Sequence, residues 1–436
     1  MKSKISRRGF LHLSFPATLA AMLAPGLLNC KESSGDIANE ILLNEGEGKT
    51  LLVVSGWQDV NIGDIAHTPG LLHVLETFLP KAKIILWKKS SSSEIVKQLL
   101  SNNFPKIKVI YGGVDSDKNV TSSDVLAAFD EADVMIHGSG PSVVGQSNLE
   151  AWVKTARKPF GIFGVTIQSV SNSLKELLQR ASFIYTRETK SIEVLREAGI
   201  YGKHIFFAPD ATFFMDIHDE KTAEAFLQEN DLEKKKFICV IPRLRYTPYH
   251  TFRPDNAGWS ADKIKMVEET NEKYKEIDHA KMREAMIRWV RETGNKVLVC
   301  PEMTYQVDIM DELLIDPLPE DVKPFVIKRG YWAPDEAASV YLNAHTVLSF
   351  ECHSPIIALH NGTPAFYLRQ PEDTIKGQMY YDLGYDDWVF EIMDTTGKQI
   401  ADQLMAVTGN YSSAQEKIQS SNNQISEIYA NAVKAI

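Results

Sequence analysis

Cysteine is scarce in this 436-residue chain, and its spacing excludes two common uses. The cysteines are Cys30, Cys239, Cys300 and Cys352, and no two of them form a C-x-x-C pair. Neither a disulfide framework nor a zinc site of the usual spacing is indicated. Cys239 and Cys300 lie inside apolar runs, so we expect buried thiols. Cys352 adjoins His353, but neighbours on a strand point to opposite faces, so a Cys–His nucleophile made of these two is not expected.

Basic residues are fewer than acidic residues. The chain has 47 Lys and Arg against 57 Asp and Glu, a formal net charge of -10. This balance argues against a broad surface for nucleic acid or anionic lipid, so we expect no nucleic-acid partner. A local basic pocket remains compatible with it. Bulk charge therefore indicates solubility rather than a partner.

Phosphate-binding signatures and internal repeats are missing as well. The loop from Gly56 to Asp64 is neither G-x-G-x-x-G nor a Walker loop, so dinucleotide binding is not supported and no cofactor or metal is expected. Gly63 would still let the backbone approach a ligand, and a helix starting near His67 would favour an anion. Asn61 and Asp64 join Gly63 as candidate substrate-binding residues.

No apolar run of the first thirty residues is long enough to span a bilayer as a mature helix. The segment has a basic start with Arg7 and Arg8 and a moderately apolar run through Leu28, and Ser6–Leu11 resembles a bacterial twin-arginine export signal. The alternative is an amphipathic helix with two incidental arginines. Leu27–Cys30 also resembles a lipobox, although Asn29 is larger than the residue usual there. We expect an export signal over residues 1–30, a lipid on Cys30, a polar tether over 31–49, and a periplasmic or membrane-anchored protein.

From Thr50 onward, short apolar runs alternate with helical patterns. The runs are too uniformly apolar to be half exposed, which indicates a parallel sheet covered on both faces. This alternation predicts an N-terminal Rossmann-like domain over residues 50–218. Its expected strands are 51–56, 83–87, 107–111, 134–137, 160–165, 183–186 and 205–208.

A charged helical stretch over 219–236 separates this series from a second one, which predicts a C-terminal Rossmann-like domain over 237–411 and a polar C-terminal helix over 412–436. The expected strands are 238–242, 296–300, 324–327, 346–350 and 364–368, and helices are expected over 280–293 and 335–344. Two such halves in tandem imply a cleft between them that holds a ligand.

The strand, polar tip, helix and second strand over Val347–Leu368 carry the strongest candidates for catalysis. Glu351 and His353 follow the strand, and the carboxyl ends of strands face the ligand crevice in open α/β sheets. An acid and an imidazole two residues apart are candidate proton-transfer groups. The alternative is a His that caps the next helix.

Two further strand ends of the first half supply candidate substrate-binding residues. The loop His137–Pro141 is short of side chains, so backbone amides around Gly138 and Gly140 are placed to meet a sugar or an acidic group, and a structural turn explains the same glycines. Arg187 follows the strand ending at Thr186. It is either a carboxylate or phosphate clamp, or it pairs with Glu188 or Asp210.

In the second half, Arg243 and Arg245 lie on the same side of an extended segment at a strand end. The aromatic insert Tyr246–Trp259 that follows them is either a wall or lid for a sugar or a disordered loop. Glu302 and Asp308 lie at a further strand end and complete the candidate set.

Several of these segments together resemble the polysaccharide pyruvyl transferase family over most of residues 50–367. The segments are Asn61–Asp64, His137–Gly140, Thr186–Ser191, Ala208–Phe213 and Cys352–Ala358 with Gly362–Pro364. The resemblance implies two Rossmann-like domains in a glycosyltransferase-B-like arrangement and transfer of pyruvate from phosphoenolpyruvate onto sugar hydroxyls as a ketal. It also implies that His353 is the catalytic His and that Arg187 lies near the donor.

The chain departs from the family at one place. The family has Arg-Leu-His where this chain has Glu351-Cys352-His353, so an anion replaces a cation that would bind the donor phosphate. The expected export signal also argues against pyruvyl transfer, because phosphoenolpyruvate is a cytosolic metabolite.

Three functions therefore remain open. The first is pyruvyl transfer to a polysaccharide, with Arg187, Arg243 and Arg245 binding the donor. The second is a glycoside hydrolase or lyase that uses Glu351 and His353, or another carboxylate. The third is a glycan-binding lipoprotein without catalysis. The other carboxylates are Asp64, Asp210 and Glu302, and the aromatic residues expected to stack on sugars are Trp57, Trp259 and Trp332.

Overall fold

The computed structural model describes residues 46–91, 93–253 and 257–436. The predicted export signal, including Cys30, lies outside these residues. Within them, no helix is both long and apolar enough to cross a membrane.

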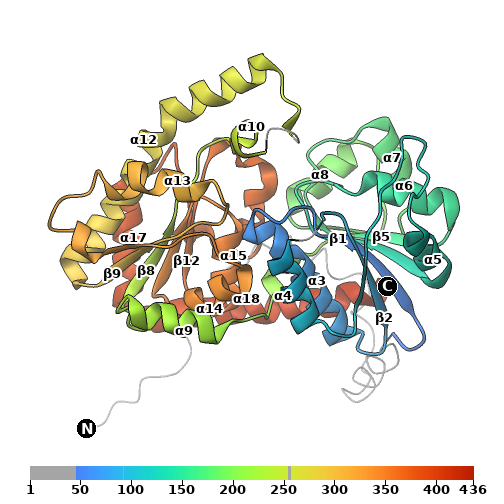
Figure 1. The fold of residues 1–436 in the computed structure, drawn as a ribbon, viewed down its shortest axis with the longest axis horizontal. Helices are drawn as coiled ribbons and strands as arrows, with labels where there is room; N and C mark the ends of the chain where they lie inside the picture. Colours follow the sequence, from blue (N-terminus) through green and yellow to red (C-terminus); the bar gives the residue numbers. More distant parts are fainter. Residues whose placement is uncertain (1–45, 92, 254–256) are drawn as a thin grey trace, which may run out of the picture. The chain divides into compact units, whose positions relative to one another are not determined.

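The first half is built on a seven-stranded parallel sheet in the order β3-β2-β1-β4-β5-β6-β7 (Figure 1). Nearly all residues of its central strands are buried, as expected for strands covered on both faces. The strands are β1 Thr50–Ser55, β2 Lys83–Lys88, β3 Lys108–Ile110, β4 Val134–His137, β5 Phe160–Val165, β6 Phe183–Thr186 and β7 Ile205–Phe207.

Helices connect these strands, and the first of them corrects one expectation. Helix α3 begins at Ile62 rather than near His67, because the Asn61 side chain accepts hydrogen bonds from the amides of Gly63 (2.6 Å) and Asp64 (3.2 Å) and so caps the helix. His67 therefore lies inside the helix. The helices are α3 Ile62–Phe78, α4 Glu94–Asn103, α5 Ser123–Glu131, α6 Gln146–Thr155, α7 Asn172–Leu178, α8 Thr189–Glu197 and the 3-10 turn η2 Ala211–Phe214.

The second half repeats the plan with a six-stranded parallel sheet in the order β10-β9-β8-β11-β12-β13. Its last strand, β13, has only three residues and was not expected. The strands are β8 Phe237–Ile241, β9 Lys296–Val299, β10 Val326–Lys328, β11 Thr346–Ser349, β12 Ala365–Arg369 and β13 Val389–Glu391.

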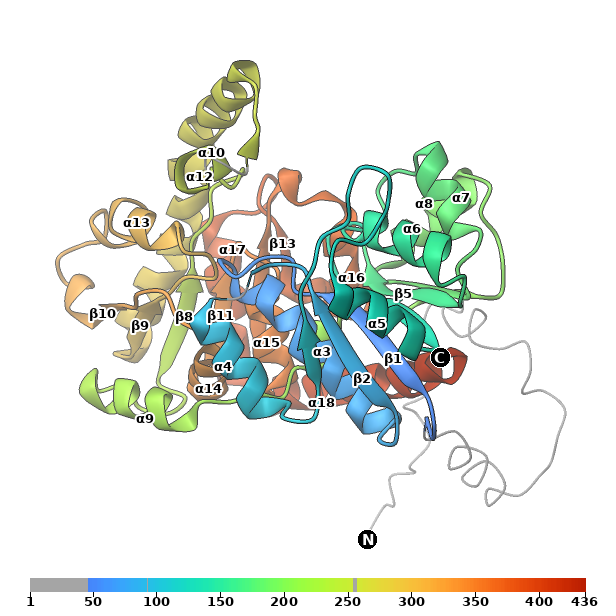
Figure 2. The same ribbon diagram turned by 45° about the vertical axis from the view of Figure 1, so that its right-hand side comes forward.

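Among the helices of this half, α12 starts nineteen positions before the predicted helix. Its early turns are rich in Lys and Glu, lack an apolar face, and extend away from the sheet in Figure 2, which is why periodicity missed them. The helices are α9 Glu220–Glu229, α10 Tyr249–Phe252, α12 Ala261–Thr293, α13 Gln306–Met310, α14 Pro334–Asn343, α15 His353–His360, α16 Gln378–Asp382, α17 Gly397–Gly409 and α18 Tyr411–Ala432, with a 3-10 segment η5 over Pro371–Gly377.

Both sheets share one strand order, and this order positions the candidate site. In each sheet the first three strands are added toward one edge and the later strands toward the other, so the strand order reverses between two neighbouring strands. These are β1 and β4 in the first sheet and β8 and β11 in the second. Ligands of such sheets bind beyond the carboxyl ends of the strands at this reversal. The predicted fold class, two Rossmann-like halves, is confirmed.

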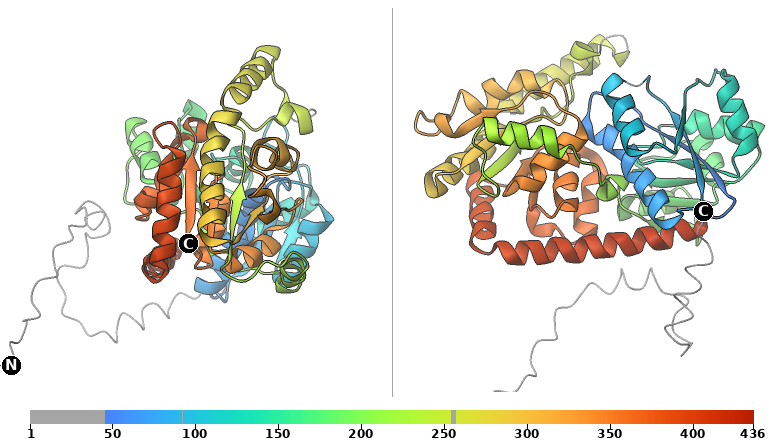
Figure 3. Two further views of the ribbon diagram at one scale, coloured as in Figure 1. Left: turned by 90° about the vertical axis from the view of Figure 1, so that its left-hand side faces the viewer. Right: turned by 60° about the horizontal axis from the view of Figure 1, so that its bottom comes forward.

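Helix α18 contacts both halves. Near its start the hydroxyl of Tyr411 donates to the carbonyl of His345 (3.1 Å), beside β11. Near its end the hydroxyl of Tyr429 donates to the carbonyl of Asp210 (2.7 Å), after β7. The right-hand view of Figure 3 shows this long red helix passing beneath both sheets.

Candidate functional site

Backbone hydrogen bonds join the loop after β1 to the loop after β9. The amide of Ile62 donates to the carbonyl of Glu302 (2.9 Å), and the amide of Thr304 donates to the carbonyl of Val60 (3.1 Å). Asn61 and Met303 form an antiparallel bridge between them. The start of α3 is thereby fixed against residues of the second half.

A buried group of ionisable residues, which we call the histidine cluster, lies next to this bridge. His67 Nε2 is 3.0 Å from His353 Nε2 and 3.2 Å from Asp210 Oδ2. Its members are His67, Arg187, Asp210, Glu302 and His353, each at most 8% exposed. The first three come from the first half and the last two from the second.

The polar ends of short helices hold the carboxylates of the histidine cluster in place. Asp210 caps η2, and its Oδ1 accepts from the amide of Thr212 (3.0 Å). Glu302 Oε2 accepts from the amide (2.7 Å) and hydroxyl (2.8 Å) of Ser354 in the first turn of α15. Its Oε1 lies 3.1 Å from His353 Nδ1. Glu302 thus orients His353 while capping the helix that carries it.

Gly63 explains why the two halves approach so closely here. A Cβ placed on Gly63 would lie 2.2 Å from His353 Nδ1, which real atoms do not tolerate. The glycine expected to admit a ligand therefore admits the imidazole of His353.

Electrostatics favour a cationic His353. Burial lowers the pKa of His353, but the contacts with Cys352 and Glu302 outweigh burial and place this pKa well above the usual value. Burial raises the pKa of Asp210, yet His67, Arg187 and His353 together hold it well below the usual value. At neutral pH the cluster therefore contains an imidazolium among ionised carboxylates.

Arg187 is paired rather than free. Its Nη1 donates to Asp210 Oδ2 (2.7 Å), its Nε donates to Thr166 (2.7 Å), and Glu188 lies 3.8 Å away. Burial raises the pKa of Glu188 to about 7 despite this neighbour. Of the two interpretations offered by the sequence, this geometry favours the structural pairing.

A second buried group, which we call the arginine cluster, surrounds Glu351. Arg243 Nε lies 3.3 Å from Glu351 Oε2, and Gln306 Nε2 donates to Glu351 Oε1 (2.8 Å). Arg243 Nη1 also donates to Asp373 and to Gln370 (3.1 Å). All five residues, Arg243, Gln306, Glu351, Gln370 and Asp373, belong to the second half.

The pKa of Glu351 is raised to about 7, because burial disfavours the anion more strongly than Arg243 favours it, and Glu302 adds repulsion. Glu351, which stands where the family has an arginine, is thus paired with Arg243, and its carboxylate can carry a proton near neutral pH.

Arg245 pairs with a different carboxylate from Arg243. Gln370, which accepts from Arg243, links the two by donating to Asp278 Oδ2 (3.2 Å). The guanidinium of Arg245 donates to both oxygens of Asp278 (2.8 and 3.0 Å) and stacks on Tyr274 with 3.5 Å between guanidinium carbon and ring centre. All three arginines that the sequence assigned to a donor are therefore paired with carboxylates.

The loop after β4 is held by its own backbone. The amide of Gly138 donates to the carbonyl of Val54 (3.0 Å), and the carbonyl of Gly140 accepts from Thr166 (3.0 Å). Both ring nitrogens of His137 contact the backbone, and burial lowers its pKa to about 4, so the ring is neutral. These contacts favour the structural-turn interpretation of the loop.

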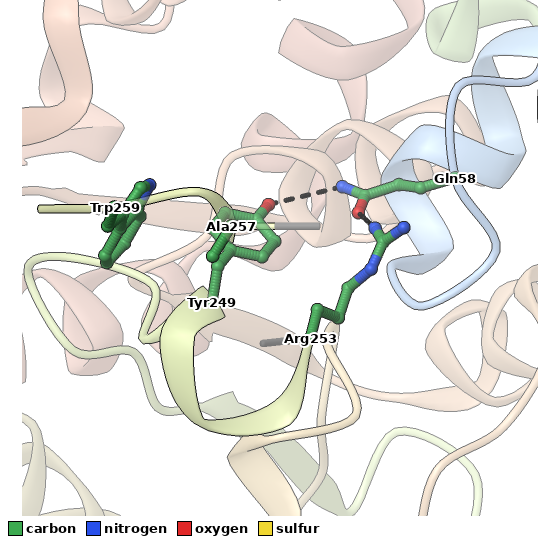
Figure 4. A pocket seen from close by; sticks show the side chains of 5 residues that line it. All are labelled: Gln58, Tyr249, Arg253, Ala257 and Trp259. Carbon is green, nitrogen blue, oxygen red and sulfur yellow. Dashed lines mark hydrogen bonds between the residues drawn. The ribbon is translucent and has the colours of Figure 1, made fainter. Parts of the chain in front are cut away.

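A cavity of about 270 Å³ lies between the loop after β1 and the aromatic insert. Gln58 Nε2 donates to the hydroxyl of Tyr249 (3.3 Å) and to Asp64, and Gln58 Oε1 accepts from Arg253 (2.6 Å), as Figure 4 shows in part. Trp259 forms a further wall. This part of the insert is an ordered wall rather than a disordered loop.

Three predicted residues have other roles. Asn61 is occupied as the cap of α3, and Asp308 is exposed on α13, outside both clusters. Trp332 is 3% exposed and donates to the carbonyl of Pro301 (2.9 Å), so it is not available to stack on a sugar. That expectation was wrong, because the residue packs into the core.

Two residues with roles in the cluster were missed. His67 is the only ionisable residue on the buried face of α3, and this feature is a signal that the sequence contained. The exclusion of a Cys352–His353 pair assumed a strand, but Cys352 is the residue before α15, in a helical conformation, and its Sγ lies 3.5 Å from His353 Nδ1. Cys239 and Cys300 are buried free thiols, as expected.

His67, Asp210 and His353 have the spacing of a metal site, with one ligand atom from each within 4.8 Å of the others. However, Arg187 donates to the same Asp210 oxygen that would bind the ion (2.7 Å), and this places a fixed positive charge beside it. We therefore assign no cation to these residues.

Solved structures define the class of fold. The chain resembles a Listeria monocytogenes protein proposed to be a UDP-N-acetylglucosamine 2-epimerase (TM-score 0.54, 13% identity, 85% of this chain and 90% of that one). It also resembles the Neisseria meningitidis UDP-GlcNAc 2-epimerase bound to UDP-GlcNAc (0.53, 10%, 88% and 99%) and Anabaena HepE with UDP and glucose (0.52, 11%, 89% and 97%). At these identities the likeness establishes the fold, two Rossmann-like domains in a glycosyltransferase-B-like arrangement.

The family follows from sequence. The family model for polysaccharide pyruvyl transferase matches residues 61–370, and the chain belongs to that family. No curated protein sequence compared with the chain matches it. The histidine cluster lies within the matched residues.

Proposed function

We propose that the protein is a carbohydrate-active enzyme in which His353 donates a proton during a reaction on a glycan. One observation carries the proposal: Glu302 orients a cationic His353, in a segment that matches the family, where the two halves meet. An imidazolium held by a carboxylate is suited to general acid catalysis.

The first candidate reaction is pyruvyl transfer, the activity implied by the family. The enol carbon of phosphoenolpyruvate takes the proton of His353, one sugar hydroxyl adds to the neighbouring carbon, and a second hydroxyl displaces phosphate to close the ketal. The two hydroxyl protons pass to bases, and Glu302 and neutral His353 are the nearest candidates.

The second candidate is glycan cleavage by a hydrolase or lyase, favoured by a specific observation. Arg187, Arg243 and Arg245 are each paired with carboxylates, so none is free to bind a phosphate without breaking a buried ion pair. Glu351, with a pKa of about 7, can act as a general acid, a role that replaces the binding of a phosphoenolpyruvate donor at this position. Both candidates place the substrate in an interdomain cleft.

The glycan itself would bind at the cavity of Gln58, Tyr249, Arg253 and Trp259. Aromatic faces and hydrogen-bonding side chains are what sugar rings require. Structural neighbours hold UDP-sugars or UDP with glucose, which supports a carbohydrate ligand for this arrangement. Export by the twin-arginine pathway and a lipid on Cys30 would place this chemistry in the periplasm or on a membrane.

The deciding experiment measures binding of phosphoenolpyruvate and of acidic and neutral oligosaccharides to the full chain by thermal shift and calorimetry, followed by product analysis. Saturable phosphoenolpyruvate binding supports pyruvyl transfer, and an oligosaccharide that is shortened supports cleavage. His353→Ala should abolish turnover in either case, whereas His204→Ala, on an outer loop, should not. Full turnover by His353→Ala would remove His353 from the mechanism, and binding without turnover would leave only the glycan-binding interpretation.

A further inference from the structure

The facing imidazoles of His67 and His353 place a limit on how many protons the histidine cluster holds. Their Nε2 atoms are 3.0 Å apart, a hydrogen-bond distance that requires one nitrogen to donate and the other to accept. Two protonated Nε2 atoms would point their hydrogens at each other. At most one proton therefore fits between the rings.

Other contacts of the two rings make this pairing specific. His353 Nδ1 is directed to Glu302, so Nε2 is the nitrogen left for His67. His67 is fully buried, its Nδ1 has no hydrogen-bond partner, and its polar contacts run through Nε2 to His353 and Asp210. A buried imidazole with one unsatisfied nitrogen costs stability, so packing alone does not account for it.

We propose that His67 and His353 form a proton-sharing pair, in which one proton beside Asp210 Oδ2 serves both Nε2 atoms and His67 sets the proton affinity of His353. Asp210 Oδ2 is 3.2 Å from one Nε2 and 3.9 Å from the other, so it stabilises the charge on either ring. His67 is thus a positioning residue that acts through His353.

Charged and titratable groups face the pair from several elements. Asp210 and Arg187 follow β7 and β6, Glu302 follows β9, and Cys352 precedes α15. From α16, the hydroxyl of Tyr380 donates to the carbonyl of Cys352. His67 is the nearest of these groups to Nε2 of His353, at 3.0 Å, whereas Cys352 Sγ lies 3.8 Å away and Asp210 Oδ2 3.9 Å away. Replacing His67 therefore tests the pair.

This inference deepens the proposed function but can be tested without a substrate. Nitrogen-15 NMR of histidine-labelled full chain would follow the ring signals of both residues across pH, in wild type and in two variants. His67→Phe removes the nitrogen and keeps the ring volume, whereas His67→Gln keeps an amide that can bond to Nε2 of His353. His204→Phe is the control for a ring change elsewhere.

The pair predicts that His67→Phe weakens proton binding by His353 at least tenfold and that His67→Gln restores most of this binding. In the wild type, the two rings should show one protonated Nε2 between them at neutral pH. Unchanged proton affinity in a folded His67→Phe overturns the pair, as does stronger proton binding there, which would mean that His67 is itself a cation. Stoichiometric Zn²⁺ or Mn²⁺ that shifts both wild-type rings, reversed by EDTA, would also overturn it. If glycan and phosphoenolpyruvate assays fail while the affinity changes, the pair stands and the proposed function does not.

Discussion

The two buried charged clusters differ in where their residues come from. The histidine cluster takes His67, Arg187 and Asp210 from the first half and Glu302 and His353 from the second. The arginine cluster is built entirely within the second half, around the ends of β8, β11 and β12. Both lie where the strand order of the second sheet reverses.

This difference separates two uses of buried charge. In the arginine cluster each charge has a partner on a neighbouring loop of the same sheet, which fixes those loops. In the histidine cluster His67 and His353 are 286 positions apart in the chain, and their imidazoles face each other beside Asp210. Ion pairs of the first kind stabilise the fold, whereas titratable groups with perturbed pKa values, as in the second kind, cluster at functional sites.

Arg187→Met should have the largest effect, because it removes the buried cation that pairs with Asp210 and leaves only His67 and His353 to stabilise that carboxylate. We expect the free energy of unfolding, measured by urea denaturation, to fall by about 3–5 kcal/mol. Arg291→Met is the matched control, since its exposed guanidinium pairs with Asp321 at the surface and its loss should be undetectable. A loss for Arg187→Met as small as that of the control would contradict the role given to this pairing.

Glu351→Gln should have an effect that depends on pH. The pKa of Glu351 is about 7 in the folded chain against an ordinary 4.5, so the stability that protonation contributes is complete below pH 4.5 and is lost as pH rises through 7. Relative to wild type, Glu351→Gln should therefore gain stability between pH 5 and pH 8, by on the order of 2–3 kcal/mol.

The measurement is the free energy of unfolding of both proteins at several pH values. Glu229→Gln, at an exposed position of α9, should run parallel to wild type across the range. A difference in stability between wild type and Glu351→Gln that stays constant from pH 5 to pH 8 would mean that Arg243 holds Glu351 ionised throughout this range.

Gly63→Ala should have the smallest effect on stability and act on one cluster only. The added methyl group would lie 2.2 Å from His353 Nδ1, so either α3 or the imidazole must shift, at a cost of about 1–3 kcal/mol. Circular dichroism melting gives the loss, and the His353 NMR signals should move while Arg243 stays in place. Gly409→Ala, with nothing near its added atom, should not lower the melting temperature, and an unshifted His353 in Gly63→Ala would contradict the close packing.

Much of the fold was predictable because its signal is local. Apolar runs between turn residues located twelve of the strands in the described residues, and β13 was missed because Val389–Glu391 is too short to show periodicity. The early turns of α12 were missed because charged residues surround the helix. The helix start at Ile62 was missed because Asn61 was considered as a ligand-binding residue rather than a cap.

The site was predictable in its members and less so in its pairings. Arg187, Asp210, Glu302, Glu351 and His353 follow strand ends, where sheet geometry gathers polar groups. Which carboxylate meets which cation depends on how the two halves pack, and no local pattern encodes it. His67 was overlooked because it was considered only as the start of a helix, and not as a side chain of the site.

Helix α18 has a consequence for the order in which the protein is completed. Residues at the end of α18 and just after it contact the half that is made first: Tyr185 donates to the carbonyl of Ala432 (2.9 Å), and Lys49 donates to that of Ile436 (2.7 Å). During synthesis the first sheet therefore stays uncovered along this side until residues 411–436 have been made. Deleting residues 432–436 would therefore remove contacts from the amino-terminal half.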